Sequence, residues 1–125
     1  MLRVTQTDTG PKTGNCLSAC AASINGRDDI DLPAWDGEGW WPAFESWLAT
    51  LGWAVTYWVA EGNPVPAGLA IGAGASPRFP GVLHAVVTLD GALEWDPHPS
   101  RAGIVGKFED WMVLEPRAGD DGESK

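Results

Sequence analysis

Cys16 is the residue whose position most directly suggests chemistry, because it stands where a loop is predicted to turn into a helix. The segment 14–23 reads Gly-Asn-Cys-Leu-Ser-Ala-Cys-Ala-Ala-Ser. A thiol at the N-terminus of a helix lies near the positive end of the helix dipole and near backbone N–H groups without a helical partner. Both effects favour the thiolate, the form of cysteine that attacks a carbonyl carbon. Cys16 is therefore a candidate nucleophile.

Two side chains that could assist such a thiolate occur much later in the chain. His84 stands near the start of the apolar segment 83–87, and Asp96 follows the segment 92–95. The Asp90-Gly91 pair between these two segments is typical of the turn of a β-hairpin. We therefore expect His84 and Asp96 to lie on neighbouring strands.

The register of this hairpin decides whether the two side chains can meet. If residues 89–91 form a three-residue loop, His84 lies directly opposite Asp96, with both side chains on one face. A two-residue turn slips the pairing by one residue and places the two side chains on opposite faces of the sheet. The sequence is compatible with both registers.

The remaining pattern predicts the elements that must position these residues. Apolar residues recur every three or four positions over 16–25, which indicates a helix, and Asn25-Gly26 would end it. A second helix is predicted from near Pro42 to Leu51. The other predicted elements are strands at 53–59, 67–71, 82–89, 92–96 and 111–114, an extended arm or short strand at 2–6, and a loop at 72–80.

These elements predict one α+β domain over residues 1–116, followed by a flexible tail at 117–125. In this domain the helix that bears Cys16 packs on a twisted antiparallel sheet. No internal repeat or second domain is evident.

Composition narrows the possible functions. The chain has 125 residues, enough for one domain with its own core, and no apolar run approaches a membrane span. A formal net charge of -9 argues against a nucleic-acid partner, because phosphate contacts need lysine and arginine. Residues 1–6 lack the apolar stretch of an export signal, and two cysteines four positions apart do not suggest a disulfide framework. We therefore expect a cytoplasmic protein.

The eight tryptophans are unusual for this length. Most must fill the core or line a groove, since so many exposed indole rings would promote aggregation. Trp40 and Trp41 belong to a cluster between the two predicted helices, and we expect at least one of them to line a substrate groove.

The order of these features resembles the papain-like superfamily of cysteine peptidases. It is most similar to the compact bacterial branch that includes peptidase domains for bacteriocin leaders. The residues that carry the resemblance are Gly-Asn-Cys-Leu-Ser-Ala-Cys at 14–20, His-Ala-Val-Val at 84–87 and Asp96-Pro97. Small bacterial and phage proteins of unassigned function have a similar layout, including Ser-Pro-Arg at 76–78 and Asp-Pro-His-Pro-Ser at 96–100.

By this resemblance Cys16 would be the nucleophile, His84 the general base and later the general acid, and Asp96 the residue that orients the imidazole. The family pattern implies Gln6 as the oxyanion donor, although ten residues separate it from Cys16, which is more than the usual spacing. Asn15 is a local substitute for that role.

The resemblance implies a thiol hydrolase, a peptidase, amidase or isopeptidase that forms an acyl-enzyme. Its substrate would be a peptide, an isopeptide or a small-molecule amide, and no cofactor is needed. We expect Trp40, Trp41, Arg78 and His98 to contact substrate. The expected location is the cytoplasm of a bacterium or of a phage-infected host cell. The oligomeric state is open.

Other interpretations remain. The same triad could pass the acyl group to an amine, or the scaffold could be catalytically idle and bind a small signalling molecule or a protein partner. A zinc site built from Cys16, Cys20, His84 and His98 is disfavoured, because neither a short CxxC pair nor a tight His pair occurs. Without the resemblance, His84 could be a core histidine and Asp96 an ordinary turn residue.

Overall fold

The computed structural model describes residues 1–11 and 14–117, which form two helices and one five-stranded antiparallel sheet. The helices are α1 (Cys16–Asn25) and α2 (Trp40–Thr50). The strands are β1 (Trp53–Val59), β2 (Leu69–Ala75), β3 (Leu83–Leu89), β4 (Ala92–Trp95) and β5 (Val105–Pro116). The predicted α+β class is therefore confirmed.

The strands follow the order β1-β5-β2-β3-β4, and all neighbours are antiparallel. β5 joins the two halves of the sheet, because it pairs with β1 through residues 110–116 and with β2 through residues 105–112. The predicted last strand, 111–114, covers only the part of β5 that contains its buried residues. Residues 105–110 are all exposed or half-buried, so they gave no apolar pattern.

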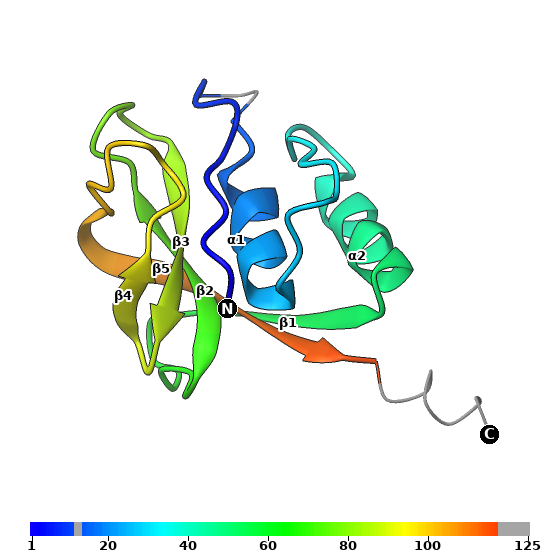
Figure 1. Cartoon of the computed structure of the whole chain (residues 1–125). Coiled ribbons are helices and arrows are strands. Elements are labelled where there is room, and N and C mark those ends of the chain that lie inside the picture. Colours follow the sequence, from blue (N-terminus) through cyan, green and yellow to red (C-terminus); the bar gives the residue numbers. More distant parts are fainter. Residues whose placement is uncertain (12–13, 118–125) are drawn as a thin grey trace.

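Both helices lie on the same side of the sheet, and the segment 26–39 passes between them (Figure 1). α1 packs on β3 and β2, whereas α2 packs on β1. The buried apolar side chains between these layers are Cys20, Ala21, Phe44, Leu48, Ile71, Ala85, Val87, Met112 and Leu114. Each larger side chain of this kind contributes about 1.5–3 kcal/mol when it is buried.

α1 has the bounds that the sequence predicted. It ends where Gly26 adopts a left-handed φ of 74°, and the N–H of Gly26 donates to the carbonyl of Ser23. Ala19, Ala21 and Ala22 are fully buried, so the helix backbone can lie close to β3. This close packing brings the first residue of α1, Cys16, to the sheet.

α2 begins at Trp40, two residues before the predicted start at Pro42. Pro42 therefore stands within the first turn, where a helix does not need its missing N–H. The segment before α2 is tied to α1, because the indole N–H of Trp35 donates to Ser18 Oγ at 2.7 Å. The Trp35 ring also packs edge-on against Phe44 of α2, with ring centroids 5.4 Å apart.

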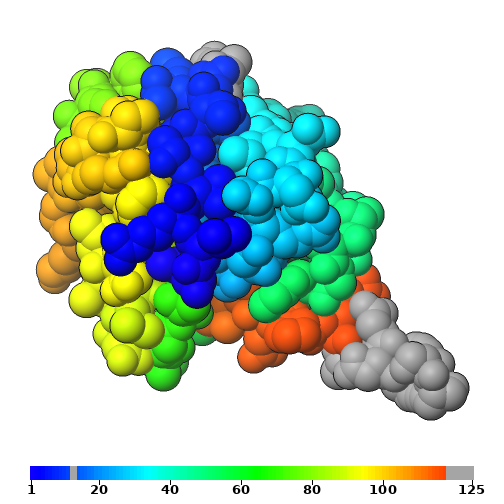
Figure 2. Space-filling model, in the orientation of Figure 1, coloured from blue at the N-terminus to red at the C-terminus, as the bar shows by residue number. Residues whose placement is uncertain are grey.

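The N-terminal residues form an extended arm rather than a strand. The arm lies across the front of the molecule, between the segment 26–39 and the residues that follow β4 (Figure 2). It is held by backbone bonds from Leu2 N–H to Ser23 O and from Gln6 N–H to Pro97 O, and the Trp95 indole donates to Val4 O. Gln6 is thereby fixed beside the loop that carries Asp96.

The predicted strand at 67–71 is too short, because β2 continues to Ala75. The prediction of a loop at 72–80 is therefore wrong for residues 72–75, whereas residues 76–80 do lie outside the strands. Gly72 and Gly74 occur there because neighbouring side chains lie against the backbone. A Cβ atom at Gly72 would stand 2.6 Å from the Phe108 ring, and one at Gly74 would collide with Ile104. These glycines therefore serve close packing within a strand.

The β3–β4 hairpin differs from both predicted registers. Its turn has two residues, Asp90 (φ 51°) and Gly91 (φ 85°), so Leu89 pairs with Ala92 and the three-residue loop is wrong. The register then shifts: Thr88 pairs with Leu93, but Val87 pairs with Trp95. Glu94 is thus an extra residue, a β-bulge. The two-residue turn alone would place His84 and Asp96 on opposite faces, and the extra residue returns them to the same face.

The chain beyond β5 is described only at Arg117, whose N–H donates to the carbonyl of Gly52. The rest of the predicted tail, 118–125, lies outside the described residues. Within residues 1–11 and 14–117, neither helix has the length and apolar character needed to cross a membrane.

Candidate active site

His84 and Asp96 are joined by a buried hydrogen bond. His84 Nε2 lies 2.7 Å from Asp96 Oδ1, and the two side chains are 5% and 1% exposed. Because Nε2 faces the carboxylate, Nδ1 is the ring nitrogen left for Cys16, whose side chain is close enough to the imidazole to raise the pKa of His84. The three residues singled out by their order in the chain therefore come together.

Asp96 is held as a carboxylate by its surroundings. Its Oδ1 accepts the N–H of His98 at 2.9 Å, and its Oδ2 accepts the N–H of Gly103 at 2.6 Å. Burial alone would raise the pKa of Asp96, but the hydrogen bonds from His84, His98 and Gly103 hold it below its usual range. Asp96 can therefore fix the imidazole while remaining ionised.

The His84 imidazole favours its protonated form. Burial alone would lower the pKa of His84, but its hydrogen bond to Asp96 and its interactions with Cys16 and with the Asp96 charge raise this pKa to about 9. A protonated imidazole beside a sulfur is the arrangement that stabilises a thiolate.

The N-terminus of α1 presents the positive end of its dipole to Cys16. No acidic side chain occupies the first turn of this helix, and the N-cap residue, Asn15, makes no side-chain capping bond. The thiol is half-buried, whereas Cys20 one turn later is fully buried. Burial raises the pKa of the Cys20 thiol, which keeps this second cysteine protonated and unreactive.

The turn that follows Asp96 is held by Arg101, a residue for which the sequence pattern predicted no structural role. Its Nη1 donates to the carbonyl oxygens of Asp96 (3.1 Å) and His98 (2.8 Å), and its Nη2 donates to Thr5 Oγ1. The guanidinium also lies 4.1 Å from the centre of a Trp95 ring. Arg101 therefore ties the Asp96 turn to the N-terminal arm and to β4.

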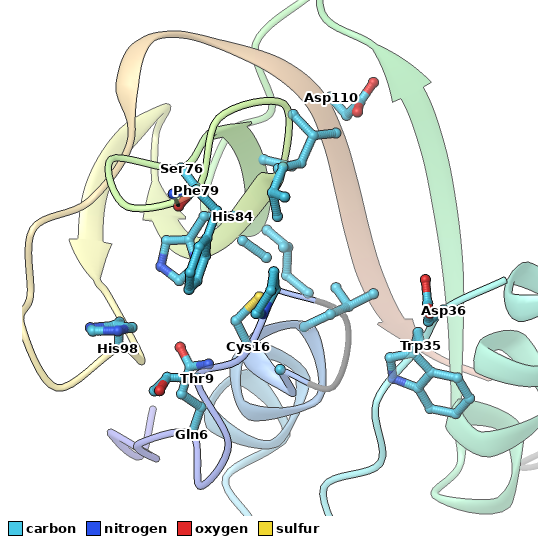
Figure 3. A pocket seen from close by; sticks show the side chains of 18 of the residues that line it. Gln6, Thr9, Cys16, Trp35, Asp36, Ser76, Phe79, His84, His98 and Asp110 are labelled. Atoms are coloured by element: carbon cyan, nitrogen blue, oxygen red, sulfur yellow. Dashed lines mark hydrogen bonds between the residues drawn. The ribbon is translucent and has the colours of Figure 1, made fainter.

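A cavity of about 570 Å³ opens beside Cys16. Figure 3 shows Cys16, His84, His98 and Gln6 at its wall. The predicted substrate residues Trp40, Trp41, Arg78 and His98 also line it. Asp96 does not line the cavity. This position suits a residue that would act on substrate only through the His84 imidazole.

The two predicted oxyanion donors are placed differently. Asn15 is committed to the fold: its Oδ1 accepts the N–H groups of Thr7 and Asp8, and its Nδ2 donates to Thr7 Oγ1 and to Leu32 O. Both amide hydrogens are used, so none is left for an oxyanion. Gln6 lines the cavity and uses one amide hydrogen, which Nε2 donates to Asp8 O at 2.7 Å. Its second amide hydrogen makes Gln6 the better donor.

Arg78 and His98 are connected through Ser100. Arg78 Nη1 donates to Ser100 Oγ at 3.2 Å, and the Ser100 N–H donates to His98 Nδ1 at 2.9 Å. Burial, and then the charge of Arg78, lower the pKa of His98. His98 is therefore a neutral imidazole whose proton is on Nε2, and its ring stands edge-on to that of His84 with centroids 6.1 Å apart.

Three aromatic side chains form one side of the cavity: Trp40 and Trp41 from α2, and Tyr57 from β1 (the aromatic wall). The ring centroids of Trp40 and Trp41 are 5.6 Å apart, and those of Trp41 and Tyr57 are 5.7 Å apart. Tyr57 was not among the predicted substrate residues, because alternation along β1 shows on which face of the strand a side chain lies but not what it contacts.

The described residues contain no group of three or more histidine, cysteine, aspartate or glutamate side chains arranged to hold a metal ion. Comparison of the chain with protein-family models, with curated proteins and with solved structures gave no match. The functional assignment therefore depends on the geometry of the site.

Proposed function

We propose that this protein is a thiol hydrolase of the papain-like kind that cleaves an amide or isopeptide bond through an acyl-enzyme at Cys16. The observation that carries the proposal is the arrangement of His84, which is hydrogen bonded to the buried Asp96 and interacts with the helix-terminal Cys16 closely enough for its pKa to rise. The cavity beside the thiol gives a substrate carbonyl access to the sulfur.

The chemistry requires two steps. The Cys16 thiolate attacks the carbonyl carbon, and the carbon–nitrogen bond breaks as the imidazolium of His84 gives its proton to the departing amine. Neutral His84 then takes a proton from water, the resulting hydroxide attacks the thioester, and the carboxylic acid leaves as the thiolate re-forms. Asp96 keeps the ring oriented in both steps and remains ionised.

The negative charge that develops on the carbonyl oxygen needs hydrogen-bond donors. The backbone N–H of Cys16 at the start of α1 and the Gln6 side-chain amide would serve as these donors. If an amine enters in place of water, the same steps transfer the acyl group, so the triad alone does not exclude an acyltransferase.

A binding function on the same scaffold is the second candidate. It is favoured by the aromatic wall and by the apolar Ile71 and Met112, which line the cavity together. Pockets with large apolar walls and few polar groups are typical of small-molecule sites.

Trapping of the acyl-enzyme tests the proposal. We expect p-nitrophenyl acetate to give a burst of p-nitrophenolate equal to the enzyme concentration, with the acetyl group found on Cys16 by peptide mass spectrometry. Cys16→Ala should lose the burst, whereas Cys20→Ala, which removes the buried thiol, should keep it. Acetylation of Cys16 no faster than that of glutathione would contradict the proposal and favour the binding function.

A further inference from the structure

The cavity has two chemically different ends. His84 and His98 lie on one side of Cys16, and Asp36 and Asp110 lie on the other (Figure 3). The end that holds the two carboxylates is called the acidic end. Asp36 is exposed at the segment before α2, and Asp110 is half-buried within β5.

Asp110 is held rigidly at the acidic end. Its backbone is part of β5 and pairs with Val59 of β1 and Ala73 of β2. Its Oδ1 accepts the hydroxyl of Tyr57 at 2.8 Å, a bond that raises the pKa of Tyr57 and so keeps this donor protonated. The carboxylate is therefore oriented by the protein, and Oδ2 is not used by this bond.

Neither carboxylate has a cationic partner in the part of the chain that the structure describes. The ion pairs found there use Glu94, Asp29 and Asp96. A half-buried carboxylate that no cation neutralises has lost part of its hydration without an ion pair in return. A ligand cation at the acidic end would provide that pair.

The aromatic wall suits a cation with an apolar stem. The face of an indole or phenol ring attracts an ammonium or guanidinium group, by about 0.5–2 kcal/mol. Ile71 and Met112 line the same cavity and offer apolar surface to methylene groups. The net charge of -9 also favours the approach of a cationic rather than an anionic ligand.

We infer that the acidic end of the cavity binds an ammonium or guanidinium group carried on an aliphatic stem, as in a lysine or arginine side chain. This inference deepens the proposed function and rests on it, since Cys16 would then cleave an acyl bond in a basic peptide or amine-bearing amide. Asp110 and the aromatic wall would select the charged group, while the triad acts on the carbonyl.

Three small probes of equal length test the inference: n-pentylamine, 1-pentanol and sodium pentanoate. Binding is followed through the indole N–H signals of Trp40 and Trp41 in NMR titrations. We expect pentylamine to bind about tenfold more tightly than either other probe, which is the effect of one partly desolvated ion pair with a cation–π contact. Asp110→Asn should abolish this preference.

Glu109→Gln is the matched control, because Glu109 precedes Asp110 on β5, is exposed, does not line the cavity and carries the same charge. It should keep the preference for pentylamine. If Asp110→Asn does not fold, Asp36→Asn should reduce the preference. Equal binding of pentylamine and pentanol, or an equal loss in Glu109→Gln, would overturn the inference.

The two proposals fail in distinguishable ways, because this titration needs no turnover. If pentylamine binds preferentially but no acyl-enzyme forms at Cys16, only the proposal of hydrolase activity is contradicted. An acyl-enzyme at Cys16 without preference for pentylamine would contradict only the basic substrate.

Discussion

His84 reaches Asp96 because β4 contains one extra residue. The two-residue turn at Asp90-Gly91 alone would direct the two side chains to opposite faces of the hairpin. The bulge at Glu94, just before Asp96, returns the Asp96 side chain to the face of His84. The resulting hydrogen bond joins His84 Nε2 and Asp96 Oδ1 at 2.7 Å.

Deletion of Glu94 should therefore separate the pair. We expect the alkylation of Cys16 by iodoacetamide at about pH 6 to slow by about tenfold or more, because the imidazole loses its carboxylate. Glu94→Gln is the control, since it removes only the surface ion pair with Arg3 (3.7 Å) and keeps the residue count. A deletion variant that reacts as fast as Glu94→Gln would show that the bulge does not position Asp96.

Removal of the Asp96 charge should destabilise the fold as well as the site. Asp96→Asn leaves a buried imidazole without its counter-charge and weakens the bonds to the N–H groups of His98 and Gly103, so we expect a loss of about 3 kcal/mol in the free energy of unfolding. Asp29→Asn breaks an exposed pair with Arg27, which solvent screens, and should cost much less stability. Urea denaturation of both variants makes the comparison, and equal small losses would argue against a buried charged pair.

Stability should fall on the alkaline side because of His84. Its folded pKa of about 9 lies above the ordinary value of 6.5, so its contribution is complete below pH 6.5 and is lost as the pH rises through about 9. This loss is of the order of 3 kcal/mol. The lowered pKa of Asp96 acts oppositely: its contribution is present above the ordinary value of 3.8 and is lost as the pH falls through the folded value.

Thermal unfolding of the wild type and of His84→Gln between about pH 5 and pH 10 measures the alkaline effect. The difference in stability between the two proteins should shrink as the pH rises through about 9. A difference that does not change over this range would mean that folding leaves the pKa of His84 at its ordinary value.

Arg101 should act as a positioning residue for the turn after Asp96. Arg101→Lys keeps the charge but not the planar fork, in which Nη1 donates to the carbonyl oxygens of Asp96 and His98 while Nη2 donates to Thr5 Oγ1. We therefore expect it to behave like Arg101→Ala. Both variants should lose about 1–3 kcal/mol of stability and shift the pH profile of Cys16 alkylation. If lysine restored both quantities, charge alone would explain the role of Arg101.

The parts of the fold that depend on local pattern could be predicted from the sequence. α1 ended at Gly26 as expected, because a left-handed glycine after an apolar stripe is a local signal. β1 had its predicted bounds, 53–59, because its residues are aromatic and β-branched. The order of Cys16, His84 and Asp96, taken together with the family resemblance, also selected the three residues that meet.

The parts that depend on tertiary packing could not be predicted. Gly72 and Gly74 were predicted to lie in a loop. They lie in a strand because the side chains of Phe108 and Ile104 occupy the space that a Cβ atom would need. Nothing local marks Glu94 as a bulge, because its effect is defined only by pairing with β3. Asp110 reaches the cavity because β1 and β2 flank β5, which is a property of the strand order.

The most direct test of the central claim is the rate of Cys16 alkylation by iodoacetamide between about pH 4 and pH 9, read for each cysteine by peptide mass spectrometry. A thiolate paired with the His84 imidazolium predicts that Cys16 reacts at about pH 6 at least about tenfold faster than glutathione, while buried Cys20 stays slow. His84→Ala should remove this advantage, and His98→Ala should keep most of it. A Cys16 that reacts no faster than glutathione at about pH 6, or equally fast in His84→Ala, would contradict the account.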